Sequence, residues 1–143
     1  MALQWNDSLE TGVAEIDHQH MEFIARINRI FDACRTGKSA QELRALLVFL
    51  EEYVVVHFGA EERHMKATAY PHYQEHKAQH DGFVHALAEL KHQAATAGPG
   101  LSTQLSANRL LSEWLINHTG KFDRALGRHL CARAAPPSAP TAG

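Results

Sequence analysis

Four stretches of this chain carry apolar residues at steps of three and four, which is the spacing of one face of a helix, and this pattern restricts the fold most strongly. Residues that break helices separate the stretches, namely Gly37, Pro71 and the run Gly98-Pro99-Gly100. No stretch shows the sustained alternation of apolar and polar residues that a half-buried strand requires. We therefore predict an all-α protein, an antiparallel up-down four-helix bundle.

The residues at the ends of the first two stretches predict where the helices begin and end. Asp17 is a candidate cap for a first helix that runs to about Arg35. Ser39-Ala40-Gln41-Glu42 is a capping-box sequence, in which Ser and Glu side chains each accept a backbone N–H, and it would open a second helix reaching about Lys66.

The second half of the chain completes the predicted bundle. The third helix should start near Pro71, and the fourth should run from about Ser102 to at least His118. The segment after Cys131 is rich in Ala and Pro and has nothing large to bury, so we expect it to be disordered. The expected organisation is one bundle over residues 1–131, with an N-terminal arm, and a tail over residues 132–143.

Composition excludes several classes of protein. The 143 residues are 45% hydrophobic and 21% charged, as in a single soluble globular domain. A net charge of −2 with neutral histidines provides no basic surface for nucleic acid, and the longest apolar run, Ala45–Leu50, is too short to span a membrane. With no signal-peptide pattern at the start and only 2 cysteines, we expect a cytoplasmic protein.

Polar side chains occupy positions on the apolar stripes where a core residue is expected. The chain has 11 histidines, and several of them share this placement with one glutamate. Burying imidazoles and carboxylates costs free energy unless each has a partner, and a bound metal ion would be a partner for every lone pair. The stripe positions are His20, His57, Glu61, His76, His80 and His118.

The spacing and chemistry of these residues favour a site with two metal ions. His57 and Glu61, and likewise His76 and His80, are four residues apart and so lie on one helix face, one turn apart. Nitrogen and oxygen ligands without a thiolate favour iron, manganese or copper over a cysteine-rich zinc site, although a zinc ion remains compatible with them. Five imidazoles are too many for one catalytic zinc ion.

With these residues, the chain resembles the hemerythrins, and most closely the single-domain bacteriohemerythrins, over about residues 5–130. The resemblance lies in a lone His, then HxxxE, HxxxH and HxxxxD, in that order along the chain. The last of these patterns adds Asp123, which is about 140° around a regular helix from His118 and would by spacing alone face solvent. Gly120 would allow the turn to widen and bring Asp123 inward.

The resemblance implies a non-haem di-iron centre that binds dioxygen reversibly for storage or delivery, in a protein that is not an enzyme. The implied irons are bridged by two carboxylates and a solvent-derived oxo or hydroxo group. One coordination position would remain open, on the iron with fewer histidines, and dioxygen would bind there. The implied ligands are His76, His80 and His118 on one iron, His20 and His57 on the other, and Glu61 and Asp123 as bridges.

Two alternatives remain open at this point. A ferritin-like di-iron oxidase uses Glu-x-x-His pairs, and the chain contains Glu15…His18 and Glu61…His64. A hemerythrin-like domain could instead sense oxygen or redox state, or handle iron, and the sequence does not identify a protein partner. The remaining histidines are expected on the surface or just outside the site: His18, His64, His72, His85, His92 and His129.

Overall fold

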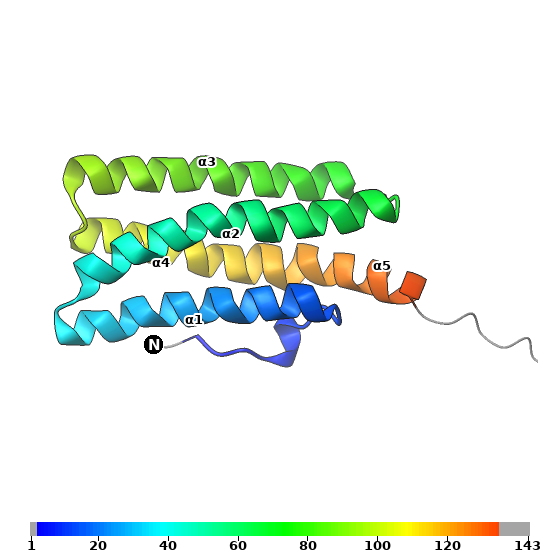
Figure 1. Ribbon diagram of the computed structural model, residues 1–143, viewed down its shortest axis with the longest axis horizontal. Coiled ribbons are helices and arrows are strands. Elements are labelled where there is room, and N and C mark those ends of the chain that lie inside the picture. The colour runs from blue at the N-terminus through cyan, green and yellow to red at the C-terminus, as the bar shows by residue number, and fades with distance from the viewer. Residues whose placement is uncertain (1–2, 135–143) are drawn as a thin grey trace, which may run out of the picture.

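The computed structural model describes residues 3–134, except for the side chains of residues 31, 34, 35 and 134, and over this range it is a bundle of helices without a strand. The helices form four rods, since α4, η2 and α5 follow one another without a break to make the fourth. The rods run antiparallel, as predicted (Figure 1). The elements are a 3₁₀ turn η1 (Asp7–Leu9), α1 (Ala14–Thr36), α2 (Ser39–Ala67), α3 (Tyr73–Ala97), α4 (Leu101–Trp114), a π-helix η2 (Leu115–Asp123) and α5 (Arg124–Ala134).

Two hydrophobic clusters make up the core, one on each side of a polar layer. The larger cluster takes α1 from Phe23 onward, α2 up to Phe58, α3 from Phe83 onward and the fourth rod up to Leu115. On every rod, the residues predicted to bind metal fall between the two clusters, except that His57 directly precedes Phe58, the last α2 residue of the larger cluster. The smaller cluster consists of Ile16, Met65, Tyr70, Leu126 and Leu130.

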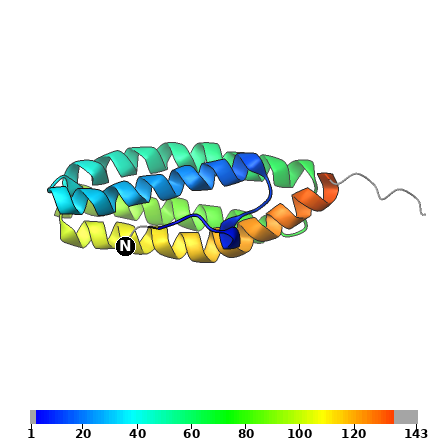
Figure 2. The same ribbon diagram turned by 90° about the horizontal axis from the view of Figure 1, so that it is seen from below.

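Asp17 holds the N-terminal arm against the start of α1 and does not cap that helix, contrary to the sequence prediction. The helix begins at Ala14, so Asp17 lies within its first turn, and the N-cap residue, Val13, has no capping side chain. The Asp17 carboxylate instead accepts hydrogen bonds from the Thr11 backbone N–H at 2.8 Å and the Thr11 hydroxyl at 2.7 Å. This contact closes the arm onto the bundle, and Figure 2 shows the arm running back beneath α1 toward the fourth rod.

The predicted capping box at the start of α2 was wrong. Lys38 is the N-cap and makes no side-chain capping bond, and Ser39 is already the first helical residue. The Ser39 hydroxyl accepts a hydrogen bond at 3.1 Å from the amide of Gln104 on α4. A contact with another helix has therefore replaced the local one.

Other expectations need smaller changes. The third helix begins at Tyr73, after Pro71 rather than at it. The chain stays helical through Ala134, past the boundary expected at residue 131. The rest of the expected tail lies outside the described residues. None of the described helices has the length and apolar character needed to cross a membrane.

A close approach of the arm to α5, at Gly127, gives a test of the fold. A Cβ atom at residue 127 would overlap the Thr11 carbonyl oxygen and lie 2.8 Å from the Thr11 Cβ. We expect Gly127→Ala to lower the free energy of unfolding by about 1–3 kcal/mol, measured by urea denaturation.

The matched control is Gly82→Ala, on α3, where an added Cβ meets nothing within 4 Å. It should leave stability unchanged or raise it by up to about 1 kcal/mol, because alanine favours helix more than glycine does. Equal effects of the two substitutions would contradict the close packing of α5 on the arm.

Candidate metal centre

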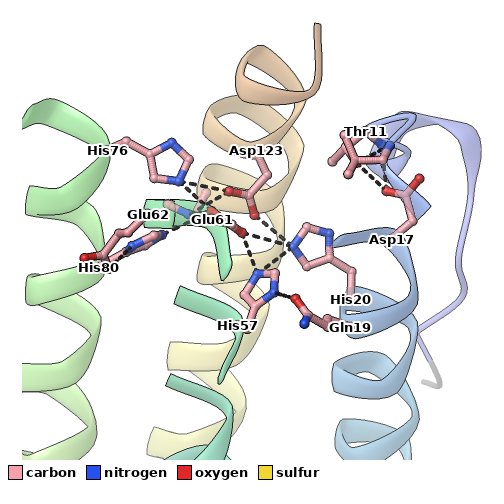
Figure 3. Close-up of polar contacts among 12 residues, drawn as sticks. Thr11, Asp17, Gln19, His20, His57, Glu61, Glu62, His76, His80 and Asp123 are labelled. Atoms are coloured by element: carbon pink, nitrogen blue, oxygen red, sulfur yellow. Dashed lines mark hydrogen bonds and ion pairs between the residues drawn. The ribbon is translucent and has the colours of Figure 1, made fainter. Parts of the chain in front are cut away.

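Seven polar side chains meet in the layer between the two hydrophobic clusters. Each is no more than 1% exposed, and Figure 3 shows those that it labels pointing toward one another. Their nitrogen and oxygen atoms form two groups, each compact enough to hold a metal ion, and the same two carboxylates belong to both groups. The residues are those singled out in the sequence: His20, His57, Glu61, His76, His80, His118 and Asp123.

The two carboxylate oxygens of Glu61 face different groups of histidines. Its Oε2 lies 2.7 Å from Nε2 of His76 and 3.2 Å from Nε2 of His80. Its Oε1 lies 2.6 Å from Nε2 of His57, one turn away on the same helix. A carboxylate placed in this way can bridge two cations, one in each group.

The two carboxylate oxygens of Asp123, on the fourth rod, also face different groups of histidines. Its Oδ1 lies 2.9 Å from Nε2 of His118 and 3.1 Å from Nε2 of His76, whereas its Oδ2 lies 2.9 Å from Nε2 of His20. The π-helix Leu115–Asp123 makes this possible, because its i→i+5 turns place a residue five positions after His118 on the same face. The expected widening of the helix therefore occurs, and it extends well beyond the turn at Gly120.

Several buried polar atoms of the centre have no hydrogen-bond partner among the described residues. Nε2 of His118 and Oδ1 of Asp123 are only 2.9 Å apart, yet neither atom makes a hydrogen bond with a described residue. Oε1 of Glu61 is also without a hydrogen bond. Unpaired buried polar atoms are costly, and a bound cation removes that cost, so the donor set fits metal ions.

Burial and mutual attraction set the charge of the centre when it holds no metal. Burial opposes the charged form of His20 and of His76, but the carboxylates of Asp123 and Glu61 outweigh it and raise the pKa of each imidazole from 6.5 to about 9. Burial likewise opposes ionisation of Glu61 and Asp123, but the imidazoles hold the pKa of both carboxyls well below the usual range. A metal ion binding here displaces protons.

Aromatic rings stack on two of the histidines and restrict the orientation of their planes. The Trp114 ring stacks on His118 at 3.8 Å between ring centroids with planes 9° apart, and the Phe122 ring lies nearly parallel to His118 at 5.6 Å. Phe58 stacks on His80 at 4.0 Å. These contacts restrict ring rotation and cover the centre with apolar surface.

The other histidines lie outside the centre, in agreement with the sequence analysis. His64 is half-buried and lies 3.3 Å from Glu15, and His129 is half-buried against the Thr68 hydroxyl at 3.0 Å. The first Glu-x-x-His pair is not assembled toward the centre, because His18 is exposed. The exposed histidines are His18, His72, His85 and His92.

Two side chains beside the centre were not found from the sequence. Gln19 contacts His57 and Glu62 contacts His80, each through the ring nitrogen that points away from the carboxylates (Figure 3). The only signal in the sequence is that each directly adjoins a predicted ligand, Gln19 before His20 and Glu62 after Glu61.

The fold and the site together define a class of protein, namely four-helix bundles with a central cluster of histidines and carboxylates that is suited to cations. Residues 11–130 match the family model described as the hemerythrin HHE cation binding domain. The chain therefore belongs to the hemerythrin family.

Known relatives and solved structures are similar to this chain over most of its length. A bacteriohemerythrin of Methylococcus capsulatus is 35% identical over 122 residues, which are 85% of this chain and 91% of the relative. A bacteriohemerythrin of Pseudomonas aeruginosa is 34% identical over 121 residues, which are 85% of this chain and 76% of the relative. Crystal structures of hemerythrin mutants superimpose with a TM-score of 0.72 at 32% identity, covering 91% of this chain and 98% of theirs.

The pKa values of the centre predict how the stability of the metal-free protein depends on pH. The raised pKa of His20 and of His76 stabilises the fold fully below pH 6.5, and this contribution is lost as the pH rises through about 9. The lowered pKa of Glu61 contributes above its usual 4.5 and is lost as the pH falls toward the lowered value. Urea unfolding in the presence of a chelator should therefore show the greatest stability between about pH 5 and 6.5.

Saturating metal should remove the decline above pH 6.5, because the imidazoles then hold metal instead of protons. His92→Gln, which changes an exposed imidazole, should keep the wild-type profile. Stability that stays constant from pH 6 to 9 without metal would contradict the proposed charge state of the centre.

Proposed function

We propose that the centre holds two non-haem iron ions and binds dioxygen reversibly, so that the protein stores or delivers oxygen. One observation carries the proposal. Glu61 and Asp123 each direct one carboxylate oxygen toward the group of three histidines and the other oxygen toward the group of two. Iron at one position would be held by His76, His80 and His118, and iron at the other by His20 and His57, with a solvent-derived oxo or hydroxo bridge between them.

The unequal number of histidines indicates where dioxygen would bind. One group has three imidazoles and the other has two, while both carboxylates are shared. The position beside His20 and His57 therefore lacks one ligand that its neighbour has. Bound ferrous ions would supply the electrons and the open coordination position that dioxygen requires.

The rest of the centre favours reversible binding. The seven polar residues are at most 1% exposed, so bulk water and its protons are kept away from the open position. Trp114, Phe58 and Phe122 provide apolar walls around the histidines. We place the protein among binding proteins of the cytoplasm rather than among enzymes.

Loading the metal-free protein with ferrous iron under anaerobic conditions, and then admitting oxygen, tests this function. We expect a visible absorption band that appears with oxygen, disappears under vacuum and returns on re-exposure. Continuous consumption of oxygen and a reductant would instead indicate an oxidase. One bound zinc ion, or no oxygen-dependent spectrum, would refute the proposal.

A pair of substitutions tests the residue assignment. His118→Ala should lower the iron content below that of the wild type, because it removes an imidazole from the group of three. His92→Ala should not change it, since His92 is an exposed residue of α3. Metal analysis of the two purified variants, with circular dichroism to confirm folding, gives the comparison, and equal iron contents would contradict the assignment.

A further inference from the structure

Two of the five buried histidines form a hydrogen bond to a polar side chain through the ring nitrogen that points away from the centre. Nδ1 of His57 donates to the amide oxygen of Gln19 at 2.6 Å, and Nδ1 of His80 donates to a carboxylate oxygen of Glu62 at 3.0 Å. In each ring this leaves the lone pair of Nε2 directed at the centre. No hydrogen-bond partner for Nδ1 is found among the described residues for His20, His76 and His118.

The two outer partners differ in charge. Gln19 is half-buried and neutral, whereas the Glu62 side chain is 20% exposed and lies 3.8 Å from the ammonium of Lys77. A hydrogen bond from an imidazole N–H to a carboxylate is about twice as strong as one to a neutral oxygen, and it makes the opposite ring nitrogen a better electron donor. His80 is therefore a stronger potential ligand than His57.

The two partners also serve different groups of histidines. His80, backed by Glu62, belongs to the group of three, and His57, backed by Gln19, belongs to the group of two. The difference in charge therefore adds to the difference in ligand number instead of offsetting it.

We propose that Glu62 and Gln19 make the two metal positions unequal, so that the position with three histidines fills first and the position with two fills second. This inference rests on the proposed two-metal centre. Glu62 acts through His80 as a positioning residue that strengthens the first position. Gln19 fixes the ring of His57 without adding charge and leaves the second position weaker, which is also the position expected to bind dioxygen.

Anaerobic calorimetric titration of the metal-free full-length chain with ferrous ion tests the order in which the two metal positions fill. Wild type should bind in two distinguishable steps. Glu62→Gln should weaken the first step by about tenfold or more and leave the second nearly unchanged. The amide has almost the same shape as the carboxylate, so a purely structural role for Glu62 would not move the affinity.

The reverse substitution and a matched control complete the test. Gln19→Glu should strengthen the second step by about tenfold and bring the two affinities closer together. This gain cannot result from misfolding, which keeps the inference testable if Glu62→Gln is unstable. Glu89→Gln removes the carboxylate of another glutamate–histidine pair, 3.3 Å from His85 on the exposed face of α3, and should leave both steps unchanged.

The outcomes separate this inference from the proposed function. Two steps that neither Glu62→Gln nor Gln19→Glu alters would overturn the inference and leave the two-metal centre intact. A wild-type second ion that binds more tightly than the first would also overturn it. Failure of the wild type to bind two ions would refute the proposed centre itself.

Discussion

Everything in this bundle depends on holding two ionised carboxylates in its interior. Glu61 and Asp123 are fully buried, and burial alone would make both of them neutral. Five imidazoles prevent this, and because those imidazoles come from all four rods, the rods must meet in one register at this layer. The hydrophobic clusters on either side stabilise the bundle, while the polar layer fixes which residues face one another across it.

The regular part of this arrangement could be predicted from the sequence. Steps of three and four placed His20, His57, Glu61, His76 and the other stripe histidines on inward faces, since a helix repeats every 3.6 residues whatever its neighbours are. Asp123 could not be found in that way, because it lies five residues after His118 on a turn that departs from the α-helix. Only the family resemblance predicted it.

The remaining differences have a common cause, which is that contacts between segments replaced contacts within one. Asp17 and Ser39 have the residue types of helix caps, but their side chains bond to Thr11 and Gln104 instead. Glu62 points away from the stripe of its own helix and reaches His80 on the next one. Such pairings depend on how two helices lie against each other, which the local sequence does not specify.

The π-helix has a consequence beyond the placement of Asp123. Each residue of a regular α-helix advances the side-chain direction by about 100°, so a single five-residue step in a stripe of threes and fours acts as a phase shift in the fourth rod. After that shift, Leu126 and Leu130 face Ile16 and Met65 in the smaller cluster. Without it, α5 would be rotated by about one residue and would turn those leucines away from the bundle. The fourth rod therefore joins two helices of different phase, and the same local irregularity that carries a carboxylate inward also keeps this end of the molecule closed.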